Sequence, residues 1–111
     1  MRIIGTRHFE RQCKVLGKRY RSIDDDVKAS LRVFRKEDAQ YLGAKLYKVR
    51  VRSSNIAKGK SGAFRLIVLC IEIRDIIVPV TLYQKSSQES ITERELEYHL
   101  ARIRAELKEI I

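Results

Sequence analysis

Residues 46–85 read LYKVRVRSSNIAKGKSGAFRLIVLCIEIRDIIVPVTLYQK, and this stretch decides the fold. Near its start, in YKVRVR at residues 47–52, apolar and basic side chains alternate. A period of two is that of a β-strand with one buried face. Residues 53–62 are rich in Ser, Asn and Gly, which predicts a loop after this strand.

Two further strands complete an antiparallel meander. Residues 63–73 are apolar on both faces except at Arg65, which is typical of a strand inside a sheet. A tight turn then leads into a third strand at residues 76–85. Because Pro79 lacks the N–H that a sheet ladder needs, we expect this strand at an edge.

Helical spacing marks the segments on both sides of the meander. Apolar residues recur every three or four positions in residues 9–20 and again in residues 22–39, which predicts a helical hairpin. The three aspartates at residues 24–26 offer a cap and negative charge at the start of the second helix. After the meander, Thr92 and Glu95 form a capping box ahead of an apolar stripe, so a C-terminal helix is expected.

These elements predict an α+β fold. A short β-type run at residues 1–5 precedes the helical hairpin, and the three-stranded antiparallel meander would complete a four-stranded sheet before the C-terminal helix. We expect the helices on one side of the sheet. The length of 111 residues suits a single domain, residues 1–111.

The composition indicates a cytoplasmic protein with a polyanionic partner. The formal net charge is +10, which favours nucleic acid or an acidic protein. Cys13 and Cys70 lie in apolar segments without metal-ligand spacing, so we expect buried free thiols in a reducing compartment. No apolar run approaches the roughly 20 residues that span a bilayer, and we expect no membrane association.

If the helices cover one face of the sheet, the opposite face is strongly basic. Alternation places on the covered face Val49, Val51, Phe64, Leu66, Val78, Val80 and Leu82. It places on the open face Lys48, Arg50, Arg52, Arg65, Tyr83 and Lys85, with Lys58 and Lys60 on the adjoining loop. Cations that hold phosphates beside an aromatic ring that stacks on a base are typical of RNA binding.

Basic residues on an open sheet face are often only a solvated surface. Two details favour a binding role. Most of the acidic residues gather in residues 24–26 and in the C-terminal helix, rather than being interspersed with the basic ones. Arg65 interrupts an apolar strand, where a charge costs free energy unless it has a partner or a task.

The same face could cleave RNA without a metal or another cofactor. Only His8 and His99 are present, and no metal-ligand spacing occurs. RNA carries its own nucleophile, because its 2′-hydroxyl can attack the adjacent phosphate once a base removes the proton and cations stabilise the added charge. Lys58 or Lys60 could act as that base or as the acid, since neighbouring cations disfavour a further positive charge.

Two segments resemble the RelE/ParE superfamily of bacterial toxin-antitoxin toxins, in particular its RelE- and HigB-like branch. They are LYKVRVRSSNIAKGKSGAFRLIVL at residues 46–69 and VTLYQKSSQESITEREL at residues 80–96. The specific part is GKSG-x-x-R at residues 59–65 followed by Y-x-K-x-x-Q-E at residues 83–89. Ala63 stands where many relatives have a second glycine.

The resemblance implies a ribosome-dependent mRNA endoribonuclease, an mRNA interferase that inhibits translation by cutting mRNA in the decoding site through 2′-hydroxyl attack. It implies catalytic roles for Lys58, Lys60, Arg65, Tyr83 and Lys85. Lys48, Arg50 and Arg52 would hold phosphates of messenger or ribosomal RNA. A cognate antitoxin that masks or distorts the basic face is also implied.

Two other functions remain open from the sequence. A ParE-like member of the same fold would inhibit DNA gyrase by binding and would need no catalytic residues. A noncatalytic RNA- or ribosome-binding module would show salt-sensitive binding without cleavage.

Overall fold

The computed structural model describes residues 1–55, 64–85, 88 and 90–110. Lys58 and Lys60, expected on the basic loop, lie outside the described residues. The elements are β1 (Arg2–Ile3), α1 (Arg7–Gly17), α2 (Ile23–Arg32), β2 (Gln40–Gly43), β3 (Leu46–Val51), β4 (Phe64–Ile71), β5 (Ile76–Gln84) and α3 (Glu93–Ile110). None of the described helices is both long enough and apolar enough to cross a bilayer.

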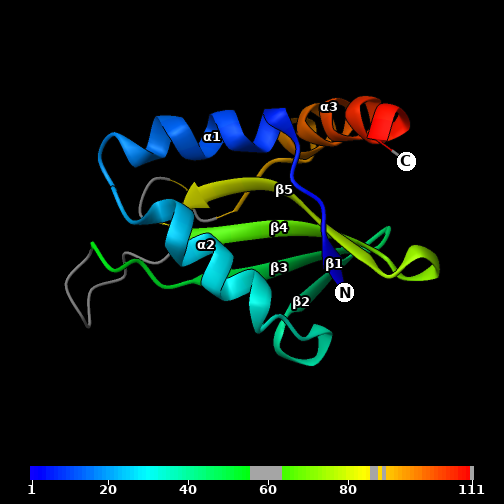
Figure 1. Ribbon diagram of the computed structural model, residues 1–111, viewed down its shortest axis with the longest axis horizontal. Coiled ribbons are helices and arrows are strands. Elements are labelled where there is room, and N and C mark those ends of the chain that lie inside the picture. The colour runs from blue at the N-terminus through cyan, green and yellow to red at the C-terminus, as the bar shows by residue number, and fades with distance from the viewer. Residues whose placement is uncertain (56–63, 86–87, 89, 111) are drawn as a thin grey trace.

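The described strands form a five-stranded mixed sheet in the order β1-β5-β4-β3-β2 (Figure 1). β1 runs parallel to β5, and the other neighbouring strands are antiparallel. The α+β class, the N-terminal strand, the helical hairpin, the meander and the C-terminal helix are therefore confirmed. The sheet is larger than the expected four strands because β2 pairs with β3.

The turn between β2 and β3 explains why β2 was not predicted. Gly43, Ala44 and Lys45 have positive φ angles of 90°, 51° and 67°. Tight hairpin turns need this left-handed conformation, but their usual sequence signal is Asn-Gly or Asp-Gly. Ala44 and Lys45 give no such signal, because residues with a β-carbon rarely adopt positive φ.

The expectation that β5 is an edge strand is wrong, since β5 lies between β1 and β4. Pro79 is nevertheless tolerated there, because β1 pairs only with Ile76 and Ile77 and ends before reaching it. The register between β4 and β5 also shifts at this point, so that Val80 is an extra residue, a β-bulge.

Because of the bulge, β5 side chains before and after Val80 do not follow a single alternation between the two faces of the sheet. Val78 pairs with Leu69, whereas Leu82 pairs with Leu66. Leu69 and Leu66 are an odd number of residues apart on β4 and therefore point to opposite faces. The prediction that Val78 and Leu82 share a face is thus wrong.

One face of the sheet, here called the hairpin face, lies against the helical hairpin. Cross-strand pairing places on it Val49, Val51, Phe64, Leu66 and Leu82, as expected. α2 packs against β3, and the Tyr20 ring after α1 meets the Phe64 ring edge-on with the centroids 5.0 Å apart. Val51, Phe64, Leu66 and Leu82 belong to the apolar core, and Val49 packs against it.

The opposite face, here called the cationic face, carries Lys48, Arg50, Arg65 and Tyr83. It is not open over its whole width. Ile67, Val78 and Thr81 lie on it and are at most 3% exposed. α1 and α3 pack against β5, and the Thr81 hydroxyl on the cationic face donates to Gln12 of α1, so the helices reach beyond the hairpin face. The expectation of helices on one side only is therefore wrong for the β5 end of the sheet.

The second helix of the hairpin is shorter than expected and ends at Arg32. Its aspartates do not supply a side-chain cap at the N-cap position, Ser22. Instead, the Asp26 carboxylate accepts hydrogen bonds from the backbone N–H and the hydroxyl of Ser54, at 2.9 and 2.6 Å. Asp26 thereby ties the start of α2 to the segment that follows β3.

α3 begins and is buried as its sequence predicts. The Glu95 N–H donates to the Thr92 hydroxyl at 3.1 Å, which confirms the capping box. The stripe positions Leu100, Ile103 and Leu107 are at most 8% exposed. Most of the stripe is therefore core.

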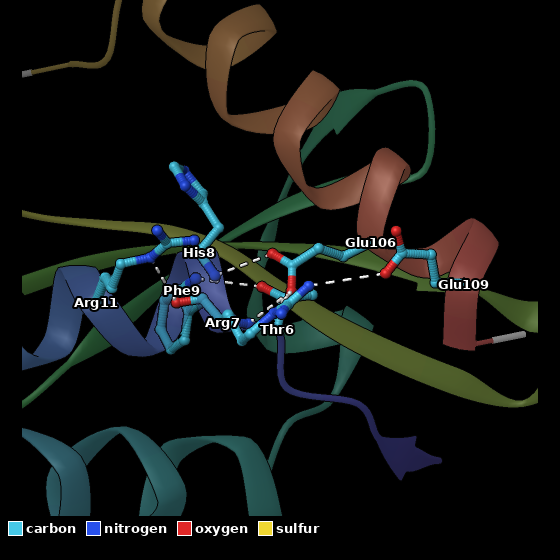
Figure 2. Close-up of polar contacts among 7 residues, drawn as sticks. All are labelled: Thr6, Arg7, His8, Phe9, Arg11, Glu106 and Glu109. Carbon is cyan, nitrogen blue, oxygen red and sulfur yellow. Dashed lines mark hydrogen bonds and ion pairs between the residues drawn. The ribbon is translucent and has the colours of Figure 1, made fainter.

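Glu106 anchors α3 to the start of α1 (Figure 2). Its carboxylate accepts hydrogen bonds from the backbone N–H groups of Arg7 and His8, at 2.9 and 3.0 Å. The Thr6 hydroxyl accepts from the N–H of Phe9 at 3.2 Å. Together they satisfy the donors that the first turn of a helix leaves without partners.

A histidine pair continues the same contact between α1 and α3. Nε2 of His8 lies 2.8 Å from Nδ1 of His99, so one ring donates and the other accepts. Burial, with the nearby charges of Arg11 and Arg102, lowers the pKa of His8. Burial and the neighbouring His8 lower the pKa of His99. Both shifts favour a neutral pair.

Replacing Glu106 by alanine should lower the free energy of unfolding by about 1–2 kcal/mol at pH 7, the usual cost of a lost helix cap. Desolvation opposes ionisation, but the N–H groups of His8 and Arg7 outweigh it and hold the pKa of the Glu106 carboxyl below its usual 4.5. The contribution is therefore complete above that value and is lost as pH falls through the lowered pKa. Chemical denaturation at pH 7 and pH 3 measures both effects.

Glu109→Ala is the matched control, because Glu109 pairs with the Arg7 guanidinium at 3.7 Å, as Glu106 does at 3.4 Å, but has a side chain 74% exposed. Its loss should change the free energy of unfolding by less than about 0.5 kcal/mol. Equal effects of the two substitutions would contradict the capping role of Glu106.

Candidate functional site

Three of the predicted site residues lie side by side across the cationic face. Arg50 on β3 pairs with Arg65 on β4, and Arg65 pairs with Tyr83 on β5. The sheet thus sets two guanidinium groups and a phenol in one row. Like charges directly opposite each other on neighbouring strands are destabilising, so the row costs stability that a folding role does not explain.

Arg65 and Tyr83 have hydrogen-bonding capacity left over. Within the described part of the chain, neither the buried Nη1 of Arg65 nor the buried hydroxyl of Tyr83 has a hydrogen-bond partner. Among those same residues, no carboxylate forms an ion pair with Arg50 or Arg65. Buried polar groups almost always have partners, and exceptions often mark functional sites.

Tyr83 is suited to donate a proton or a hydrogen bond. It is 8% exposed, and burial raises the pKa of its phenol, although the Arg65 charge and the nearby backbone N–H of Ile91 act in the opposite direction. The phenol therefore stays protonated at neutral pH. Its burial also corrects the expectation of a freely exposed ring that stacks on a base.

The other predicted residues stand around this row. Lys48 is half-buried and lies in the next row, opposite Ile67. Arg52 is exposed one residue beyond the end of β3, and Lys85 is exposed one residue beyond β5. All of these belong to the same half of the cationic face or to its margin. Lys58 and Lys60 cannot be placed, since the described residues do not include them.

The two cysteines take no part in this site. Cys13 and Cys70 are free and buried, as predicted. Burial, helped by Asp24 and Glu10, raises the pKa of the Cys13 thiol to about 12. Such a thiol is not a nucleophile at neutral pH. Within the described part of the chain, no three His, Cys, Asp or Glu side chains gather as a metal site would require.

One polar contact near the row was not predicted from the sequence. The side-chain amide of Gln12 on α1 donates to the Val80 carbonyl at 3.0 Å and accepts from the Thr81 hydroxyl at 2.6 Å. These residues lie two or three positions from Tyr83. The only sequence signal is a polar side chain beside the buried Cys13, which did not distinguish Gln12 from an ordinary surface residue.

The geometry can bind and polarise a phosphate. Two guanidinium groups provide fixed positive charge and planar donors for anionic oxygens. A neutral phenol beside them can donate to an oxygen on which charge develops. A row of this kind suits a phosphodiester substrate that supplies its own nucleophile.

Comparisons with known proteins agree with this fold. The protein-family model described as RelE toxin of the RelE/RelB toxin-antitoxin system matches residues 1–109. An arginine double mutant of the E. coli toxin RelE, solved in the free state, superposes with a TM-score of 0.51 at 14% sequence identity. That match covers 79% of this chain and 86% of the E. coli chain. No match is found among curated protein sequences.

Proposed function

The chain belongs to the RelE toxin family of RelE/RelB toxin-antitoxin systems, and on this premise we propose that it is a ribosome-dependent mRNA endoribonuclease. The observation that carries the proposal is the row of Arg50, Arg65 and Tyr83 on the cationic face. Its guanidinium groups have no carboxylate partner among the described residues.

The proposed reaction is an internal transfer that needs no metal. The mRNA 2′-hydroxyl loses its proton to a base, and its oxygen bonds to the adjacent phosphorus while the bond to the 5′-oxygen breaks. The 5′-oxygen takes up a proton. The products are a 2′,3′-cyclic phosphate on one fragment and a 5′-hydroxyl on the other.

Each residue of the row has a role in this proposal. Arg65 stabilises the charge on the phosphate oxygens as the transition state forms. Tyr83 donates a hydrogen bond or a proton, since its phenol is neutral. Arg50, with Lys48 and Arg52 beside it, holds the RNA backbone. The base belongs to Lys58, Lys60 or Lys85, the amines that the sequence places near the row.

The partners follow from the family and the charge. A RelE-type toxin has a cognate antitoxin. We propose that the antitoxin is acidic and covers the cationic face, because the toxin carries a formal net charge of +10. The ribosome, as the site of the reaction, would place the protein in the cytoplasm.

Induction in cells tests the proposed function. Expression of the wild-type protein should stop translation and produce new mRNA 5′ ends inside translated regions, which primer extension maps to codon positions. The Arg65→Ala, Tyr83→Phe double variant should lose these ends. DNA damage with intact mRNA would instead indicate a gyrase inhibitor, and translational arrest without new ends would indicate a noncatalytic ribosome binder.

A further inference from the structure

The position of Tyr83 depends on the β-bulge at Val80. Ile67 pairs with Thr81, and the next residue of β4, Val68, pairs with Pro79. β5 therefore contains one extra residue, Val80, between these two pairs. If the bulge relaxed, each later β5 residue would move by one position. Arg65 would then lie opposite Leu82, and Tyr83 would turn to the hairpin face opposite Phe64.

Sequence and topology weaken the sheet where the bulge occurs. Pro79 has no N–H, and its nitrogen faces the β1 side of β5, as the Ile77 carbonyl that accepts from Ile4 does. β1 itself ends at Ile3, whose partner is Ile77, so it gives no support at Val80. Val80 itself has no partner residue in either neighbouring strand.

Gln12 contacts the bulge from α1. Its amide N–H donates to the Val80 carbonyl at 3.0 Å, and its amide oxygen accepts from the Thr81 hydroxyl at 2.6 Å. Thr81 is 3% exposed, so its hydroxyl would lack a partner without Gln12. The Gln12 side chain therefore forms hydrogen bonds with two successive residues of β5, Val80 at the bulge and Thr81 just after it.

We propose that Gln12 is a positioning residue for Tyr83: it holds the β5 bulge in the register that sets the phenol beside Arg65. The inference rests on the proposed function for its catalytic meaning, but the positioning itself concerns only the fold. Gln12 does not touch the substrate in this proposal. It acts through the backbone of β5, as bulges near active sites do when they direct a side chain.

The test compares Gln12→Met with a matched pair at its partner. Methionine keeps the length of the side chain but forms neither hydrogen bond. Thr81→Val removes the hydroxyl with little change of shape, whereas Thr81→Ser keeps the hydroxyl. NMR of protein labelled at the tyrosine ζ-carbon follows the phenol directly, with Tyr83→Phe assigning its signal. Steady-state cleavage on ribosomes gives kcat and KM.

Gln12→Met should shift the Tyr83 signal and raise the pKa of the phenol further, because the ring would leave the Arg65 charge that lowers this pKa and turn toward buried Phe64. It should lower kcat by about 10- to 100-fold, since small displacements of a catalytic group cost this much, and leave KM within about twofold. Thr81→Val should show the same changes at smaller size, and Thr81→Ser should behave like wild type.

An unchanged Tyr83 signal and titration in folded Thr81→Val and Gln12→Met would overturn the proposal. So would a loss of activity shared equally by Thr81→Val and Thr81→Ser. If the signal shifts as expected but wild-type protein cleaves no RNA, the positioning stands and the proposed function fails. The two ideas are therefore tested separately.

Discussion

Replacing Arg65 by alanine should reduce ribosome-dependent mRNA cleavage by about 10²- to 10³-fold, the usual loss when one fixed donor to a developing oxyanion is removed. Arg65 stands at the centre of the row, paired with Arg50 on one side and with Tyr83 on the other. Its Nη1 is buried without a hydrogen-bond partner among the described residues, so no hydrogen bond of the described chain would be lost if the guanidinium turned toward a phosphate oxygen.

The stability of Arg65→Ala separates this role from a structural one. The substitution removes the repulsion between paired guanidinium groups and leaves no carboxylate of the described chain without its partner. The free energy of unfolding should therefore stay the same or rise slightly. Arg65→Lys keeps the charge but loses the planar fork, and its cleavage rate should fall between those of wild type and alanine.

Exposed Arg52 provides the control for simple loss of charge. Arg52→Ala removes one cation near the same face and should weaken RNA binding only several-fold, with stronger dependence on salt than on pH. Equal losses for Arg52→Ala and Arg65→Ala would mean that the face acts through its total charge. Cleavage by Arg65→Ala within threefold of wild type would remove Arg65 from the mechanism.

Removing the phenol oxygen with Tyr83→Phe should lower the cleavage rate by about 10²- to 10⁴-fold, the range for a general acid. The ring stays, so packing is preserved. The hydroxyl proton is buried without an acceptor among the described residues, and only the backbone N–H of Ile91 lies near the oxygen, so its loss should change the stability little. A large loss of cleavage rate with an unchanged free energy of unfolding would indicate that the Tyr83 hydroxyl acts in the reaction and not in the fold.

The pH profile distinguishes an acid from a base at this position. Burial raises the pKa of Tyr83 above its ordinary value of 10.0, so the phenol remains protonated throughout the neutral range. Cleavage by wild type should then show no loss from Tyr83 ionisation below about pH 10. A basic limb that begins near pH 7 or 8, and disappears in Tyr83→Phe, would contradict the assignment.

Much of the fold could be predicted because its signals are local. The capping box at Thr92 and Glu95, with the apolar spacing after it, determines α3 within its own segment. Alternation in β3 and the position of Arg65 in β4 correctly predicted that Arg50 and Arg65 share a face. These features depend on periodicity, which a sequence displays directly.

The features that were missed depend on backbone conformation without a sequence signal or on contacts between distant segments. The turn between β2 and β3 has positive φ angles at Ala44 and Lys45, and neither residue type predicts such a conformation. The bulge at Val80 puts Val78 on the opposite face from Leu82. Gln12, which contacts the Val80 carbonyl, is 68 residues away in the sequence. Alternation alone assumes a regular strand. It placed Tyr83 on the same face as Arg65 correctly, although Val78, on the other side of the bulge, was assigned to the wrong face.

The reaction of purified protein with mRNA paused on ribosomes tests the proposed function most directly. Wild type should cut the mRNA in the decoding site only when ribosomes are present, leaving a 2′,3′-cyclic phosphate and a 5′-hydroxyl. The Arg65→Ala, Tyr83→Phe double variant should bind ribosomes but leave the mRNA intact. Cutting by the double variant at the wild-type rate, or fragments without a cyclic phosphate, would contradict the proposed mechanism.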